Sequence, residues 1–143
     1  MTVNEILEVK GVDVITVDVH TTVAELGKLL TRKNIGAALV LDGVKLQGVV
    51  GERDIVQAIA ARGVDILEWP VTELMRTPVI TCGPDDPVTG LMATMTQRRV
   101  RHVPVLHEGR IVGVVSIGDV VKHRLKEIED EAQVLRDYIT IAR

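Results

Sequence analysis

The chain has 143 residues with 46% apolar side chains and a formal net charge of −3, so it has no basic surface field that would attract nucleic acid or an anionic membrane. Only Trp69 and Tyr138 are aromatic, which argues against base stacking, and the single cysteine, Cys82, excludes an internal disulfide or a thiolate-rich zinc site. With no signal-like N-terminus and no apolar run of ~18 residues, we expect a soluble cytoplasmic protein with no metal, no nucleic-acid partner and no membrane insertion.

The first part of the chain predicts a helical turn, a strand and a helix. Residues 3–7 form the expected turn, and residues 14–17 are strand-like. Thr22 and Glu25 have the spacing of a capping box and precede apolar residues at helical spacing. A helix is therefore expected to begin directly after Thr22.

A hairpin and a second helix are expected next. Residues 37–41 and 45–50 are strand-like, and Asp42-Gly43 between them is a strong signal for a tight turn. The pattern from about Arg53 to Arg62 is helical, and Gly63 closes it. This part of the chain therefore predicts the order strand, helix, strand, strand, helix.

The second part of the chain repeats this order. Gly113–Val121 matches Gly48–Val56 at its glycine, two valines, aspartate and last valine, with an offset of 65 residues. The other expected elements are a turn at 71–75, a strand at 79–82, a helix capped by Asp86 with Pro87 in its first position, and strands at 103–106 and 110–115. We expect repeats at 1–68 and 69–124, with Trp69 plugging the seam at the linker, and a helical extension at 125–143.

The last helix is expected to run from Ile117 to Ile139, about 34 Å at 1.5 Å per residue, which is longer than so small a core can cover. Its outer apolar residues follow one another in steps of three and four, as in a coiled coil: Leu125, Ile128, Ala132, Leu135 and Ile139. The helix either folds back on its own domain or pairs with a second subunit. We expect the second arrangement, and hence a homodimer.

The repeated stretch places a helix start directly after an apolar strand, where free backbone N–H groups favour phosphates and hydroxyls. Ser116 and Asp119 have capping-box-like spacing, so both could serve the helix alone. Both copies keep an aspartate, Asp54 or Asp119, although Gly51 replaces the serine; a cap alone explains this less well than a ligand does. No catalytic constellation accompanies these residues, so we expect no enzyme.

The repeat resembles the CBS domain, named after cystathionine β-synthase, of which two in tandem form a CBS pair or Bateman module. The motifs that carry the resemblance are Met75-Arg76-Thr77-Pro78-Val79, Arg101-His102-Val103-Pro104-Val105, Gly113 to Asp119, Asn34 to Val40 and Gly48 to Asp54. The resemblance implies an α/β (α+β) fold of two β-α-β-β-α repeats related by a pseudo-two-fold axis, with two clefts between them. It also implies a stand-alone pair of bacterial type, with no catalytic domain attached.

In this family the clefts commonly take adenosine-containing ligands, which implies roles for individual residues. Asp119 would accept hydrogen bonds from ribose hydroxyls, and Ser116 would contact ribose or phosphate. Arg98, Arg99 and Arg101 are phosphate candidates, although cations at a helix end have an ordinary explanation. The other implied ligand-binding residues are Ile15, Thr16, Gly36, Ala37, Arg53, Asp54, Pro78, Val79, Ile80, Thr81, His102, Val103 and Pro104.

The two clefts are expected to be unequal. A basic cluster around Arg101 and His102 has no charged counterpart at the aligned positions of the first repeat. We expect this cluster to lie with Ser116 and Asp119 in a cleft that binds anionic phosphates. The other cleft, marked by Asp54 and a glycine in place of the serine, is expected to be neutral or vacant.

The resemblance therefore implies a regulatory module that senses energy or redox state by binding AMP, ADP or ATP, with NAD(H) as a further candidate. One alternative is a binder of S-adenosylmethionine. Another is a protein-interaction or dimerisation module with vacant clefts. A regulated protein partner, which the sequence does not identify, is also implied.

Overall fold

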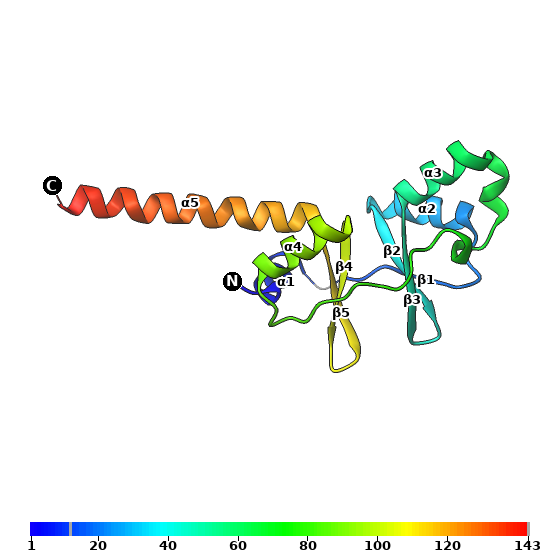
Figure 1. The fold of residues 1–143 in the computed structure, drawn as a ribbon, viewed down its shortest axis with the longest axis horizontal. Coiled ribbons are helices and arrows are strands. Elements are labelled where there is room, and N and C mark those ends of the chain that lie inside the picture. Colours follow the sequence, from blue (N-terminus) through cyan, green and yellow to red (C-terminus); the bar gives the residue numbers. More distant parts are fainter. Residues whose placement is uncertain (12, 143) are drawn as a thin grey trace.

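The computed structural model describes residues 1–11 and 13–142, and it contains two small α/β units side by side with one long helix projecting from the second (Figure 1). The elements in chain order are α1 (Val3–Lys10), β1 (Thr16–Asp18), α2 (Val23–Lys33), β2 (Ala37–Asp42), β3 (Lys45–Gly51), α3 (Glu52–Arg62), the 3-10 helices η1 (Val64–Glu68) and η2 (Val71–Glu73), α4 (Val88–Arg98), β4 (His102–His107), β5 (Arg110–Ser116) and α5 (Ile117–Ala142). The expected mixed α/β class and the repeated order of elements are confirmed.

The first unit is a three-stranded sheet in which β1 is parallel and β3 antiparallel to the central β2. Helix α2 begins at the predicted capping box. Thr22 accepts a hydrogen bond from the N–H of Glu25, and the Glu25 carboxylate accepts one from the N–H of Thr22. Leu26 and Leu30 of this helix are buried in one cluster with residues of all three strands, which fixes α2 against the sheet.

The strand expected at residues 79–82 is not formed, and only Cys82 pairs there, as a parallel bridge to β4. In the first unit the N–H of Leu39 donates to the carbonyl oxygen of Ile15 at 3.1 Å and supports the pairing of the first strand. Pro104 occupies the position of Leu39 in the second unit and has no N–H to donate. The second sheet therefore keeps only β4 and β5.

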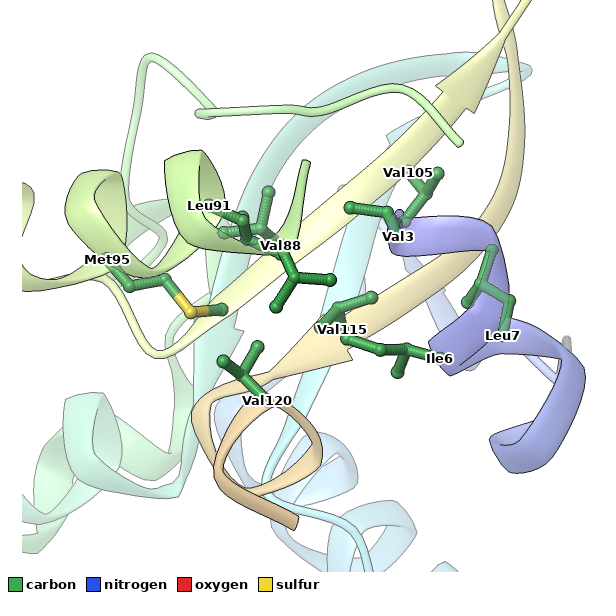
Figure 2. Close-up of a cluster of buried hydrophobic side chains, with 10 residues drawn as sticks. Val3, Ile6, Leu7, Val88, Leu91, Met95, Val105, Val115 and Val120 are labelled. Atoms are coloured by element: carbon green, nitrogen blue, oxygen red, sulfur yellow. The ribbon is translucent and has the colours of Figure 1, made fainter. Parts of the chain in front are cut away.

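The two units exchange their first helical turns. Helix α1 packs into the core of the second unit, where Ile6 and Leu7 are buried beside Val115 and Val120 (Figure 2). In the same way, Val71 of η2 is buried in the core of the first unit. Each core therefore draws on both repeats of the sequence.

The glycine that opens both copies of the repeated stretch makes room for this exchange. A Cβ atom on Gly113 would lie 2.7 Å from Cδ2 of Leu7, and one on Gly48 would lie 2.7 Å from Sδ of Met75. Cβ atoms do not approach other heavy atoms so closely in packed interiors. A larger residue at either position would force the side chain of Leu7 or Met75 to move.

Two local expectations are wrong. Trp69 does not plug the seam between the repeats: it is only half-buried, whereas Ile66 is the fully buried residue of the linker, in η1, which contacts α2 and α3 of the first unit. Asp86 does not cap α4, because Pro87 occupies the N-cap position. The Asp86 carboxylate instead accepts a hydrogen bond from the N–H of Gly83 at 2.8 Å. This bond closes the turn before α4.

Helix α5 confirms the expected long helix and continues three residues past Ile139. It contacts α1, α4 and β5 near its start and then runs away from both units (Figure 1). It does not fold back on its own unit.

Candidate functional site

In each unit an aspartate holds the helix start that follows the last strand. The carboxylate of Asp119 accepts a hydrogen bond from the N–H of Ser116 at 2.8 Å, and Asp54 accepts one from the N–H of Gly51 at the same distance. The Ser116 hydroxyl also accepts a hydrogen bond from the N–H of Asp119 at 3.1 Å, which completes a capping box. The capping role considered from the sequence is therefore present in both copies.

Packing explains why residue 51 is a glycine and not a serine. A Cβ atom there would lie 2.7 Å from the carbonyl oxygen of Gly36. That oxygen also accepts a hydrogen bond from the N–H of Glu52 at 3.0 Å, so the loop cannot retreat without losing the bond. A serine at this position would collide with backbone. The missing hydroxyl in the first copy therefore follows from packing.

A cleft of about 320 Å³, here named cleft A, lies between the two units beside Asp119. The predicted ligand-binding residues among its walls are Ile15, Gly36, Ala37, His102, Ser116 and Asp119. Lys10 enters from the end of α1, and its ammonium donates to the Asp119 carboxylate and to the carbonyl oxygen of Val114, each at 2.5 Å. The carboxylate therefore has a counter-ion within the protein.

The environment of Asp119 keeps it ionised. Burial alone would raise the pKa of this carboxyl. Hydrogen bonds from Lys10 and Ser116, with the positive charge of Lys10, outweigh burial and lower the pKa below its ordinary value. At neutral pH the group is a carboxylate that can accept hydrogen bonds from hydroxyl donors.

A second cleft of about 370 Å³, cleft B, lies beside Asp54. Nε of Arg76 lies 3.4 Å from Oδ1 of Asp54, so this carboxylate also has a cation beside it. The charged residues that line cleft B are Glu52, Arg53, Asp54, Arg76, Arg99 and Arg101. Four arginines and two carboxylates make cleft B basic, whereas cleft A has Lys10 against Asp13 and Asp119.

The structure groups the predicted residues differently from the expectation. Arg101 lines cleft B with Asp54, whereas Asp119 and Ser116 line cleft A; His102 and Gly36 line both clefts. The expected grouping of Arg101 with Asp119 is therefore wrong. The helix start at Ser116 and Asp119 faces the loop before β2, and the helix start at Gly51 and Asp54 faces the loop before β4. Each helix start thus faces a loop of the other repeat, which an alignment of the two copies within one sequence does not reveal.

The remaining predicted residues line neither cleft within the described chain. They are Thr16 and Thr81, which are exposed, Pro78, Val79 and Ile80 in the segment before Cys82, Val103 and Pro104, which are buried in β4, and Arg98, which is exposed at the end of α4. Val103 belongs to the hydrophobic core of the second unit. For these residues a contact with ligand stays a prediction.

His102 stands between the two clefts. Burial, followed by the positive charges of Lys10 and Arg76, lowers the pKa of its imidazole. The side chain is therefore neutral at neutral pH, with one ring nitrogen as donor and the other as acceptor. Because it faces both clefts, a charge placed in either one acts on the same ring.

Lys10 and Arg76 are the site residues that sequence reasoning missed. Arg76 lies in one of the motifs that resemble the family, but no role was assigned to it. No local pattern links Lys10 to Asp119, which is 109 positions away. The sequence offers one sign that the two cations are equivalent: Lys10 and Arg76 each precede the first strand segment of their repeat.

Three further observations concern the described residues. No helix in residues 1–11 and 13–142 is both long and apolar enough to cross a membrane, and no cluster of three or more His, Cys, Asp or Glu in these ranges could hold a metal ion. Burial, with a smaller effect of Asp86, raises the pKa of Cys82 to about 11. This thiol is therefore a poor nucleophile at neutral pH.

Comparison with known proteins identifies the repeats. The family model of the CBS domain matches residues 5–61 and 71–126. CBS domain-containing protein CBSX3, mitochondrial, of Arabidopsis thaliana is 35% identical over 123 residues, and the A-adding tRNA nucleotidyltransferase of Geobacter sulfurreducens is 32% identical over 124 residues. The alignments cover 82% and 87% of this chain but only 60% and 14% of those two proteins.

Solved structures show the same architecture. The CBS-domain containing protein ATU1752 from Agrobacterium tumefaciens has a TM-score of 0.84 and 39% identity, covering 87% of this chain and 99% of that one. The CBS domain pair of MJ0100, in complex with 5′-methylthioadenosine and S-adenosyl-L-methionine, has a TM-score of 0.78 and 27% identity, covering 89% and 98%. PAE2072 from Pyrobaculum aerophilum, complexed with AMP, has a TM-score of 0.73 and 29% identity, covering 83% and 89%. The chain therefore belongs to the CBS domain family and carries two CBS domains in tandem.

Proposed function

We propose that the chain is a regulatory, non-enzymatic CBS pair that binds an adenosine-containing ligand between its repeats. The observation that carries the proposal is an arrangement that occurs twice: an ionisable carboxylate at a helix start, with one cation beside it, in a cleft between the units. Of two solved relatives, one holds AMP and the other holds 5′-methylthioadenosine and S-adenosylmethionine. The shared part of these ligands is adenosine.

A ribose diol suits these carboxylates. An ionised carboxylate accepts two hydroxyl hydrogen bonds, and such bonds are stronger than those between neutral groups. Oδ2 of Asp119 accepts the bonds from Ser116 and Lys10, and Oδ1 accepts none from the described residues. The diol would use the free oxygen and compete with Lys10 for the other, which would release the ammonium toward the rest of the ligand.

The charges of the two clefts favour different ligands. Cleft B, with its four arginines, suits the phosphates of AMP, ADP or ATP, and NAD(H) is a further candidate. Cleft A, with Lys10 against Asp13 and Asp119, suits a neutral or cationic adenosine compound. S-adenosylmethionine, whose sulfonium is positive, is the alternative ligand for this cleft.

Ligand binding would act on the rest of the molecule through the segments that cross between units. Lys10 ends α1, and α1 contacts α5, so displacement of its ammonium would reach the start of the projecting helix. A ligand shifts such an equilibrium only through unequal affinity for the two arrangements. We propose that the module works in the cytoplasm as a homodimer and passes this change to a regulated protein.

Thermal unfolding with a ligand panel tests the proposal. AMP, ADP, ATP, NAD⁺, NADH and S-adenosylmethionine are compared with GMP and ribose 5-phosphate as controls for the base and the sugar phosphate. At a hundredfold excess over its dissociation constant, a ligand adds about 2.7 kcal/mol. For a chain of this size, that corresponds to a rise in Tm of roughly 4 °C or more. A flat response to every adenosine compound would contradict the proposal.

A second function is favoured by one observation, the exposed apolar stripe of α5 described below. In this case the chain is a protein-interaction module and its clefts are vacant. The panel would then leave the Tm unchanged, while removal of the stripe would still change assembly. The two functions are therefore distinguishable in the same set of samples.

A further inference from the structure

Helix α5 carries an apolar stripe that nothing in the described chain covers. The helix has 26 residues and is about 39 Å long, and only Val120 at its start is buried. The stripe, here named the α5 seam, consists of Val121, Leu125, Ile128, Ala132, Leu135 and Ile139. The large residues of the seam are 48–60% exposed. Exposed apolar surface of this extent on one helix face is typical of an interaction site.

The spacing of the seam indicates the kind of partner. Its residues are separated by steps of four and three, which average 3.5 residues and keep the seam facing one neighbouring helix along its length. A globular surface needs the wider stripe of an amphipathic core helix. The α5 seam therefore fits another helix with the same repeat.

The charges beside the seam match a second copy of the same helix. In a parallel coiled coil in register, heptad position g of one helix faces position e of the following heptad, five residues later, on the partner helix. Arg124 then faces Glu129 of the second copy, and Glu131 faces Arg136 of the second copy. Symmetry repeats both contacts, so all four are between opposite charges. In the single chain, Arg124 contacts Glu127 of its own helix at 3.0 Å, and it would have to share or leave that contact.

The charges also decide the orientation when the whole seam is used. An antiparallel pair that overlaps from Val121 to Ile139 would place Glu129 against Glu129 and Glu131 against Glu131. Like charges at such positions are unfavourable. The parallel pair avoids these contacts and keeps every layer of the seam apolar.

We propose that two copies of this chain associate through the α5 seam as a parallel two-stranded coiled coil. In this arrangement both CBS pairs lie at the same end of the coil, where their α1 helices contact α5. The coil is formed by residues outside clefts A and B, so the proposal does not depend on the ligand.

Sedimentation equilibrium of the full chain and two variants tests the interface. Ile128→Lys places a charge in the seam, whereas Val134→Lys makes the same kind of change at a residue outside the seam that is 68% exposed. The wild type and Val134→Lys are expected to be dimers. Ile128→Lys is expected to weaken the dimer by on the order of a hundredfold or more, because each copy loses a buried apolar contact. Circular dichroism verifies that the variants remain folded.

A monomeric wild type, or an Ile128→Lys variant that dimerises as well as Val134→Lys, would overturn the proposal. The orientation has its own test in a Cys82→Ser background. Val121→Cys alone and Ile139→Cys alone are each expected to form a disulfide-linked dimer on oxidation. Cross-linking only when the two variants are mixed would show an antiparallel pair and overturn the parallel assignment.

Discussion

The ammonium nitrogen of Lys10 lies 2.5 Å from a carboxylate oxygen of Asp119, although the first belongs to the first repeat and the second to the second repeat. The reverse pair, Arg76 of the second repeat with Asp54 of the first, lies at 3.4 Å. Each carboxylate that could bind a ribose is thus accompanied by a cation from the other repeat. A ligand that uses either carboxylate has to compete with that cation.

Replacement of Asp119 separates its ligand role from its capping role. Asp119→Ala is expected to weaken binding of an adenosine ligand in cleft A by about ten- to a hundredfold, because charge-assisted hydrogen bonds contribute roughly 1.5–3 kcal/mol. Loss of the helix cap should also cost about 1 kcal/mol of unfolding free energy. Asp85→Ala, which removes an exposed carboxylate in the turn before α4, is the control. A loss of stability with unchanged affinity would leave Asp119 with the capping role alone.

The Lys10–Asp119 pair makes a pH-dependent contribution to stability. The folded-state pKa of Asp119 is lowered, so its contribution is present above the unfolded-state value of about 3.9 and is lost as the pH falls through the folded-state value. Lys10→Met should reduce the unfolding free energy at pH 7 by at most about 1 kcal/mol, because both side chains are partly exposed.

Urea unfolding of the wild type and Lys10→Met across acid pH measures this contribution. The difference between the two proteins is expected to shrink as the pH falls below about 3.9. A difference that stays constant with pH would show that Lys10 stabilises the fold by packing and not by its charge.

If packing requires glycine at position 51, the two substitutions that swap the residues of the two copies, Gly51→Ser and Ser116→Gly, should differ in their cost in unfolding free energy. Gly51→Ser should lower the unfolding free energy by about 1–3 kcal/mol, because the new Cβ meets the carbonyl oxygen of Gly36. Ser116→Gly removes only a cap and should cost a few tenths of a kcal/mol. Denaturant unfolding of both variants provides the comparison. Equal costs would refute the steric account.

Arg101 should select for phosphate in cleft B. Arg101→Ala is expected to weaken AMP binding by about tenfold, since it removes one charge-assisted contact from a partly exposed site. The affinity for adenosine, which has no phosphate, should change little. Arg32→Ala, in the exposed last turn of α2 and outside both clefts, should affect neither ligand. Titration calorimetry at two salt concentrations measures both ligands, and equal losses for AMP and adenosine would contradict the phosphate role.

Local signals in the sequence were enough to predict most elements of the fold. The capping box of Thr22, the helix end at Gly63 and the heptad pattern of α5 each depend on residues a few positions apart. Their geometry follows from the backbone itself. The repeat offset of 65 residues then joined these elements into two copies.

Features that depend on packing between distant segments were not predictable in this way. The contact of Lys10 with Asp119 and the fit of Leu7 against Gly113 both follow from the exchange of α1 between units. The missing strand before Cys82 follows from Pro104, whose lost N–H matters only once its neighbour in the sheet is known. The sequence therefore predicted some of the residues that line the clefts, such as Asp119 and Arg101, but not their division between two crossed clefts.

Calorimetric titration of AMP and of S-adenosylmethionine into the wild type and the double variant Asp54→Ala/Asp119→Ala tests the central claim most directly. The account predicts saturable binding of at least one ligand to the wild type. It predicts at least about tenfold weaker binding to the folded double variant. No heat of binding from either ligand, or equal affinities for the two proteins, would contradict the assignment of the two clefts as adenosine-ligand sites.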